Sequence, residues 1–265
     1  MKNIFKNSLL KMWLKKNLKN LIQVETKYGK LYLLKNDEFI SGAFLRGKYW
    51  AEYEIKIFED LLNFKNSKEL VFFDVGANVG SHALGLSKIF KDRIKIYCFE
   101  AQSYVHKILE ANIYENHLRN VLAFNNAVSN NNELIQIKVP DYSQINNFGS
   151  LELKPPKYSD NNKIFFSNSI ENIGSIKLDD LKDIKVDFIK IDVEGMEHLV
   201  IEGGKELINK HRPFLFIELV KTETKDILEL FKKIKYSAYL INNENGLFIP
   251  SELKVPIRNL KKIYD

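Results

Sequence analysis

The chain has 265 residues, of which 45% are hydrophobic and 28% are charged, and its formal net charge is +6. Its one cysteine, Cys98, excludes an intrachain disulfide and any zinc motif built on paired cysteines, so we expect a reducing, cytoplasmic setting. No apolar run approaches the ~20 residues that a membrane-spanning helix needs, and the lysine-rich start is not typical of a signal peptide.

The first predicted element is a basic helix over residues 1–24. Its apolar stripe would consist of Phe5, Leu9, Trp13 (or Met12) and Leu21. We expect this helix to pack on the body of the protein or on a second copy in a homodimer. Its lysines, leucines and tryptophan would also suit the anionic inner face of a membrane.

The positive charge is concentrated at the start of the chain. Residues 1–30 hold eight lysines against one glutamate, a net charge of +7, so the rest of the chain has a net charge of −1. A protein body without a basic face is not expected to bind nucleic acid.

From residue 49 onward, helices alternate with short apolar strands. Such an alternation predicts a parallel sheet covered by helices on both faces, closed by a C-terminal hairpin. The predicted helices cover 49–64, 81–90, 103–117, 196–210 (broken near Gly203 and Gly204) and 222–234, and the predicted strands cover 69–75, 94–100, 120–128, 185–193, 213–219, 236–242 and 246–250.

The stretch 129–180 interrupts this alternation. Two antiparallel strands are predicted in it, over 133–140 and 149–154, and a polar, proline-bearing run follows. Because an insertion of this length is more often functional than idle, we expect residues 141–175 to shape the acceptor pocket.

The turn after the first apolar strand, "FFDVGANVGSHAL" (72–84), indicates the kind of ligand. Gly76 and Gly80 lack the middle glycine of a dinucleotide turn, and Asp74 would repel a pyrophosphate. S-adenosylmethionine carries a sulfonium and an ammonium and no phosphate. We therefore expect Asp74 to favour its positive end, directly or through water, Gly76 to allow close backbone approach, and the helix start at 79–81 to receive its carboxylate.

The next two strand ends fit the same ligand. Glu100 ends the second strand, where an acid accepts hydrogen bonds from both ribose hydroxyls. Asn126 and Ala127 follow the third strand, where the edge of a base would be read.

Six segments together resemble the FkbM-type family of S-adenosylmethionine-dependent methyltransferases. They are "FFDVGANVGSHAL" (72–84), "CFEAQ" (98–102), "NNAVS" (125–129), "IKLDDL" (176–181), "IKIDVEGMEHLVIEGG" (189–204) and "FLFIEL" (214–219). The chain departs from the family at Gln102, where a proline is common, and near His82, where a tyrosine-like residue is common.

The resemblance implies a class I methyltransferase fold, Rossmann-like, over 49–265, with residues 1–48 as a lead-in. That fold has a mostly parallel seven-stranded sheet and a C-terminal antiparallel hairpin. The resemblance also implies O-methylation, often of sugars or natural-product hydroxyls. The predicted cofactor contacts are Asp74, Gly76, Ala77, Asn78, Gly80, Ser81, Glu100, Ala101, Gln102, Asn126, Ala127, Asp192 and Glu194.

Carboxylates at the fourth and fifth strand ends predict how the acceptor is activated. Asp192 and Glu218 end adjacent strands and could share Mg²⁺ or Mn²⁺, an arrangement similar to that of catechol-type O-methyltransferases. A base without metal is the alternative: His82, His198 or a Lys190 of lowered pKa. Lys190 alternates with Asp192 along the strand, so an ion pair with an acid is the other role open to it.

The predicted activity is O-methylation of a carbohydrate hydroxyl, on a nucleotide-activated sugar or a surface glycan. The alternatives are a polyketide-like or lipid hydroxyl, and a non-catalytic S-adenosylmethionine-binding protein. A nucleic-acid amino-methyltransferase is not favoured, because no [DNS]-P-P-[YF] motif follows the fourth strand.

Overall fold

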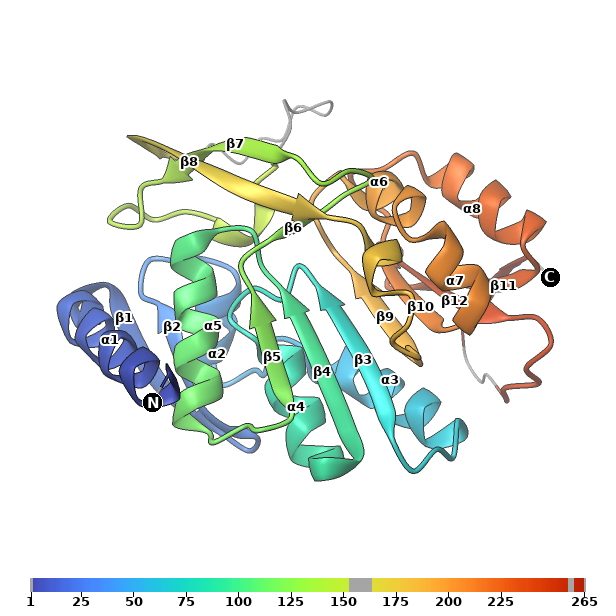
Figure 1. Cartoon of the computed structure of the whole chain (residues 1–265), viewed down its shortest axis with the longest axis horizontal. Helices are drawn as coiled ribbons and strands as arrows, with labels where there is room; N and C mark the ends of the chain where they lie inside the picture. Colours follow the sequence, from blue (N-terminus) through green and yellow to red (C-terminus); the bar gives the residue numbers. More distant parts are fainter. Residues whose placement is uncertain (1, 153–163, 257–259, 265) are drawn as a thin grey trace.

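The computed structural model describes residues 2–152, 164–256 and 260–264, with residues 2–7 described by their backbone alone. Its centre is an eight-stranded sheet (Figure 1). The strands are β3 (Leu70–Val75), β4 (Ile94–Phe99), β5 (Val121–Phe124), β9 (Phe188–Ile191), β10 (Phe214–Glu218), β11 (Tyr236–Ile241), β12 (Asn245–Pro250) and β13 (Lys261–Tyr264). Their order in the sheet is β13-β11-β12-β10-β9-β3-β4-β5.

Five strands of this sheet, from β5 to β10 in space, pair in parallel, and β12, β11 and β13 continue it antiparallel. The strand order reverses beside β3, because β4 and β5 lie on one side of β3 and β9 and β10 on the other. The predicted seven strands and C-terminal hairpin are present. The count is wrong by one, since β13 pairs along β11 at the sheet edge.

Helices cover both faces, as predicted. On one face lie α3 (Glu52–Phe64), α4 (Ser81–Phe90) and α5 (Ser103–Glu115), which pack on alternate strand residues such as Phe72 and Phe188. On the other lie α6 (Glu197–Glu202), α7 (Lys205–His211) and α8 (Thr224–Lys233), which pack on Phe73 and Ile189. Side chains of successive strand residues point to opposite faces, so each strand contributes to both cores.

The predicted break between α6 and α7 is confirmed, and its cause is a close backbone contact. A Cβ added at Gly203 would lie 2.1 Å from the carbonyl oxygen of Ser129. The chain leaving β6 (Ala127–Val128) therefore passes directly against the α6–α7 junction, where only a glycine fits.

The N-terminal segment is more than a helix. α1 (Lys2–Asn17) and a 3₁₀ turn, η1 (Leu18–Asn20), lead into a hairpin of β1 (Leu21–Thr26) and β2 (Gly29–Leu34), and α2 (Ile40–Leu45) follows. The helix predicted to residue 24 is thus wrong over its last residues. The hairpin forms because Leu21, Leu31 and Leu33 are buried against α4 and α5.

Two asparagines of α5 hold this hairpin in place. The Asn112 side chain accepts a hydrogen bond from the backbone N–H of Tyr32 (2.6 Å) and donates one to its carbonyl (3.0 Å). The Asn116 side chain does the same for Lys30 (2.9 and 2.6 Å). The free edge of β2 is thereby satisfied by side chains, so residues 21–34 pack as part of the body that is built on the main sheet.

The apolar stripe predicted on α1 is only partly buried. Trp13 packs edge-on against Tyr104, with ring centroids 5.1 Å apart, and Leu10 is buried. Leu9 and Met12 are exposed beside lysines, and the side chain of Phe5 lies outside the described part of the chain. Contact with a membrane or a second copy stays a prediction. Among the described helices, none has both the length and the apolar character to cross a bilayer.

The insertion forms a separate three-stranded sheet. β7 (Leu134–Pro140) and β8 (Phe166–Ile176) pair antiparallel, and β6 pairs parallel with the end of β8. In Figure 1 this ribbon crosses the end of the main sheet to which the β3, β4 and β5 arrows point. The strand predicted over 120–128 divides, since β5 ends at Phe124 and Ala127–Val128 join this second sheet.

The partner of β7 was predicted wrongly. Residues 148–152 form no strand: Phe148–Ser150 is a 3₁₀ turn, η3, because Phe148 is buried against the N-terminal hairpin core. Residues 153–154 of the predicted strand lie outside the described residues. Two further 3₁₀ turns, η2 (Lys91–Arg93) and η4 (Leu178–Leu181), complete the elements.

Candidate active site

A cavity of about 520 Å³ lies at the carboxyl ends of the parallel strands. In an open α/β sheet this is where ligands bind, next to the reversal of strand order. The sequence-predicted residues that line it are Gly76, Ala77, Asn78, Ser81, His82, Glu100, Ala101, Gln102, Asn126, Ala127, Lys190, Asp192, Glu194 and Glu218. Of the other predicted residues, Asp74, Gly80 and His198 are described but do not belong to the lining.

The glycine turn after β3 is shaped by its neighbouring strand. Gly76 has a φ of +79°, and a Cβ there would lie 1.8 Å from the carbonyl oxygen of Asp192. We expected the small residue to let a ligand come close; the structure shows that it lets the end of β9 come close. Gly80, at φ +89°, precedes α4, whose first residues Ser81 and His82 face the cavity.

Asp74 lies beneath the cavity and is fully buried. Neither of its carboxylate oxygens accepts a hydrogen bond in the described part of the protein, and Lys190 Nζ lies 3.6 Å from one of them. Lys190 also pairs with Asp192 (3.1 Å) and donates a hydrogen bond to the Gly76 carbonyl (2.8 Å). The lysine therefore separates Asp74 from the cavity, which argues against direct contact between Asp74 and a ligand.

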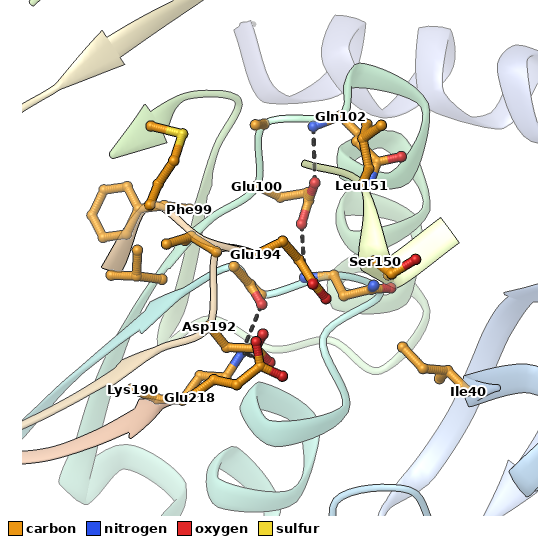
Figure 2. Close-up of a pocket in the computed structure, with 18 of the residues that line it drawn as sticks. Ile40, Phe99, Glu100, Gln102, Ser150, Leu151, Lys190, Asp192, Glu194 and Glu218 are labelled. Atoms are coloured by element: carbon orange, nitrogen blue, oxygen red, sulfur yellow. Dashed lines mark hydrogen bonds and ion pairs between the residues drawn. The ribbon is translucent and has the colours of Figure 1, made fainter. Parts of the chain in front are cut away.

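Glu100 lies at the centre of the cavity wall. Its two carboxylate oxygens accept hydrogen bonds from the backbone N–H groups of Asn78 (2.9 Å) and Gln102 (2.8 Å), as the dashed lines in Figure 2 show. Burial raises the pKa of Glu100 to about 7, against the effect of these two hydrogen bonds. The same hydrogen bonds join the turns after β3 and β4, so Glu100 holds these two loops together.

The wall beside Glu100 is fixed by amide side chains. Asn125 donates to the carbonyl oxygens of Glu100 and Ala101 (2.9 and 3.0 Å), and Asn126 donates to the carbonyl of Gly174 on β8 (3.0 Å). The Gln102 amide donates to the Phe148 carbonyl (2.9 Å). A proline, which is common at this position in the FkbM-type family, has no side-chain amide and could not donate this hydrogen bond.

Three carboxylates meet at the ends of β9 and β10. One oxygen each of Asp192, Glu194 and Glu218 lies within 4.8 Å of the others, and Figure 2 shows Glu218 beside Asp192 and Lys190. Burial, followed by repulsion from Asp192 and Glu194, raises the pKa of Glu218 to about 9. Burial likewise raises the pKa of Glu194 to about 7, although Lys221 lies 2.9 Å away.

Such a cluster attracts positive charge. A divalent cation fits the oxygen ligands by their chemistry, and the positive end of a sulfonium compound fits them equally well. Glu218 Oε2 is buried and accepts no hydrogen bond within the described residues, so no donor there stabilises the ionised form of Glu218.

The three predicted bases differ in their surroundings. Burial lowers the pKa of Lys190, but the charges of Asp192 and Asp74 raise it by more, so the net pKa lies above its ordinary value. Lys190 therefore stays charged and takes the ion-pair role. His82 lines the cavity and its Nε2 bonds the carboxylate of Glu54 on α3. His198 lies exposed on α6, outside the cavity lining.

Several lining residues had not been predicted from the sequence. The N-terminal segment contributes Phe39, Ile40 and Trp50, and the 147–151 stretch of the insertion contributes Asn147, Gly149, Ser150 and Leu151. Met196, Val220, Lys221 and Glu244 complete the wall near the acidic cluster. The general expectation for residues 141–175 named no single residue, and nothing local in the sequence marks 39–50 as part of a site.

The N-terminal segment and the insertion are joined to each other. Asp37 and Asn146 form a parallel β-bridge, Glu38 N–H donates to the Asn146 carbonyl (3.1 Å), and Asn146 N–H donates to that of Asn36 (3.0 Å). Ile40 reaches toward the cavity from the side opposite the sheet, as Figure 2 shows. Residues far apart in sequence thus build one roof over the strand ends.

Comparison with known proteins was made by sequence and by structure. Residues 74–238 match the family model described as the methyltransferase FkbM domain. No curated protein sequence matches this chain.

Solved structures with similar coordinates are methyltransferases. An FkbM methyltransferase from Methylobacillus flagellatus KT is 19% identical with a TM-score of 0.47; the match covers 68% of this chain but 43% of that one, so the present chain spans less than half of its length. Aeropyrum pernix fibrillarin, solved with S-adenosyl-L-methionine, is 12% identical (86% and 81% covered, TM-score 0.41). A Staphylococcus aureus protein proposed to be a caffeoyl-CoA O-methyltransferase is 11% identical (91% and 98% covered, TM-score 0.49).

Proposed function

This chain belongs to the FkbM family of S-adenosylmethionine-dependent methyltransferases, and from that premise we propose that it methylates a hydroxyl group of a carbohydrate. The proposal has two parts: where the methyl donor lies, and what receives the methyl group.

The donor part rests on the strand ends β3, β4 and β5. The turn at 76–78, the carboxylate of Glu100 and the Asn126–Ala127 pair line one half of the cavity in the order that a nucleoside requires. With the ribose against Glu100, the methionine portion would run along the start of α4 toward the acidic cluster. Its sulfonium and ammonium would then lie nearest to the carboxylates of β9 and β10.

The observation that carries O-methylation is the cluster of Asp192, Glu194 and Glu218 at this end. In the reaction a hydroxyl oxygen attacks the methyl carbon, the carbon–sulfur bond breaks, and S-adenosylhomocysteine leaves with the electron pair on sulfur. The hydroxyl proton needs an acceptor, and a carboxylate positioned beside the oxygen provides one. Asp192 is suited to this, since it faces the cavity and Lys190 holds it in place at 3.1 Å.

A carbohydrate acceptor is supported by the polar groups on the wall. Asn78, Asn126, Asn147 and Ser150, with side-chain amides and a hydroxyl, belong to the cavity lining. Groups of this kind recognise hydroxyl-rich ligands by paired hydrogen bonds. A polyketide-like or lipid hydroxyl is the competing acceptor, favoured by the apolar side chains Phe39, Trp50 and Val220 on the same wall.

A bound metal ion is one route by which the acceptor hydroxyl would be activated. Asp192 and Glu218 would supply oxygen ligands to Mg²⁺ or Mn²⁺, which would polarise the acceptor hydroxyl. Without metal, Asp192 would accept the proton directly.

The test begins with binding and continues with transfer. Calorimetry should detect S-adenosylmethionine and S-adenosylhomocysteine at micromolar strength, and mass spectrometry should detect the gain of one methyl group on members of a panel of glycosides, glycans and sugar nucleotides. Binding without transfer to any carbohydrate would refute the acceptor class. Transfer to polyketide-like or lipid alcohols in its place would support the competing acceptor.

Variants then separate the routes of activation. Asp192→Asn and Glu218→Gln are compared in chelator and in added Mn²⁺: loss of wild-type activity in chelator, restored by Mn²⁺, supports the metal, and unchanged activity excludes it. His82→Gln is compared with His198→Gln, whose side chain lies outside the cavity. Equal activity of these two variants would remove His82 as the base.

A further inference from the structure

The charged side chains that line the cavity are mostly acidic. Seven of the lining side chains are carboxylates or lysines, with a formal excess of three negative charges. The carboxylates are Glu100, Asp192, Glu194, Glu218 and Glu244, and the lysines are Lys190 and Lys221. Bound S-adenosylmethionine, with two positive groups and one carboxylate, adds a single positive charge and reduces this formal excess to two.

Both lysines are already paired. Lys190 neutralises Asp74 and Asp192 (3.6 and 3.1 Å). Lys221 pairs with Glu194 (2.9 Å) and with Glu152 of the insertion (3.7 Å). His82 bonds the carboxylate of Glu54. As far as the chain is described, the lining contains no arginine and no third lysine.

This pairing limits the charge of the acceptor. A diphosphate is held in proteins by cationic side chains or by helix N-terminal amides. The start of α4 is such a set of amides, and the proposed function already assigns it to the methyl donor. Protonation of Glu218 or Glu194 removes negative charge without supplying a positive group. A diphosphate placed here would face carboxylates, and like-charge contact across an interface costs several kcal/mol.

The cavity rim offers an apolar aromatic surface instead. Trp50 is 47% exposed, and Phe39 and Val220 beside the cavity are also exposed. An exposed tryptophan at a ligand cavity is typical of a surface that packs on one face of a ring and hydrogen-bonds at its edge.

The backbone around Trp50 is held rigidly. The preceding residue, Tyr49, donates a hydrogen bond from its hydroxyl to the Ser81 carbonyl (2.8 Å) and packs edge-on against Tyr28 and Phe44. The following residue, Ala51, is fully buried. Because Ser81 begins the helix beside the donor site, Trp50 has a fixed position relative to that site.

We infer, on the premise of the proposed function, that the acceptor is an uncharged sugar unit whose ring packs on Trp50, and that nucleoside-diphosphate sugars are excluded from the site. The acceptor class is thus a neutral glycoside or glycan end, methylated after the sugar has left its nucleotide carrier.

The test uses matched acceptors. The same sugars are offered as uncharged methyl glycosides, as neutral oligosaccharides and as nucleoside-diphosphate sugars, and kcat/KM is measured from S-adenosylhomocysteine formation with mass-spectrometric proof of the product. We expect uncharged acceptors to be preferred by about tenfold or more, as like-charge repulsion requires. Transfer to nucleotide sugars with equal or higher kcat/KM would overturn the inference and leave the proposed function standing.

Trp50 is tested separately. Trp50→Ala should raise KM for the preferred glycoside by about tenfold, in line with the loss of an aromatic contact. kcat and the Kd of S-adenosylmethionine should change little, and Trp50→Phe should restore most of the affinity. Tyr53→Ala is the control, since Tyr53 is 52% exposed on the adjoining helix but does not line the cavity.

The outcomes distinguish a failure of the ring-packing role of Trp50 from a failure of the proposed function. An unchanged KM in Trp50→Ala overturns the ring-packing role. An equal rise in Tyr53→Ala does so as well, because it would show a general effect on α3. A failure of every carbohydrate, with S-adenosylmethionine still bound, overturns the proposed function and the inference together.

Discussion

Glu218 should make the stability of the ligand-free protein fall as pH rises. Burial and the nearby carboxylates raise its pKa from 4.5 to about 9 in the folded state. Between these two values the folded protein retains a proton that the unfolded chain releases, so stability is complete below about pH 4.5 and is lost as pH rises through about 9. Replacement by glutamine removes the titration and keeps the size and the neutral form of the side chain.

The size of the effect follows from the shift. At about 1.4 kcal/mol per pKa unit, the full shift corresponds to about 6 kcal/mol. Because neighbouring carboxylates titrate together with Glu218, we expect the substitution to recover only part of this, about 2–4 kcal/mol above pH 9. At about 2–4 °C per kcal/mol, Glu218→Gln should melt about 5–15 °C above the wild type at high pH and at nearly the same temperature near pH 5.

The assay is thermal denaturation across this pH range, in chelator and without methyl donor, because any bound cation would lower the pKa of Glu218. Glu229→Gln, an exposed glutamate on α8, serves as the control and should follow the wild type at every pH. Parallel melting profiles for Glu218→Gln and the wild type would refute the argument that a repelled carboxylate is held at the end of β10.

Three further changes test the frame of the site. Lys190→Met leaves the buried carboxylate of Asp74 unpaired and should lower the free energy of unfolding by about 3–5 kcal/mol, measured by urea denaturation. Gly76→Ala should destabilise far more than Gly47→Ala: both glycines have positive φ, but a Cβ meets the β9 backbone at 1.8 Å in the first and nothing within 4 Å in the second. Glu100→Gln should weaken S-adenosylmethionine binding by about tenfold or more, as read by calorimetry, because a charged acceptor of hydrogen bonds is lost.

The strands and helices that the sequence predicted correctly share one property: their apolar pattern is determined by burial. β3, β4, β9 and β10 are covered on both faces, so each appears as a short run of mostly apolar residues. The elements that were missed lack this pattern. β8, with the sequence FSNSIENIGSI, has one exposed face and forms because β7 pairs with it. Propensity is a weak guide to such a strand.

Sequence periodicity also located one pair of side chains in the site. Lys190 and Asp192 were predicted to point the same way, and they form an ion pair at 3.1 Å. The contribution of residues 39–50 could not be predicted, because it depends on the bridge between Asp37 and Asn146, which are more than a hundred positions apart. A contact of that range leaves no local pattern in either segment.

Carboxylates are still the groups that would attract a cationic methyl donor, but they are not the carboxylate predicted from the sequence. From sequence, the attracting charge was Asp74 after the first strand. In the structure Lys190 neutralises that carboxylate from above, and in doing so joins the ends of β3 and β9 through the Gly76 carbonyl and Asp192. Three carboxylates of the cavity, Asp192, Glu194 and Glu218, meet at the ends of β9 and β10, where burial and then repulsion among them raise the pKa values of Glu218 and Glu194. Under the proposed function, a sulfonium bound at that end of the cavity would have its methyl group directed toward the acceptor side, so the same carboxylates would both favour the donor and orient it for transfer.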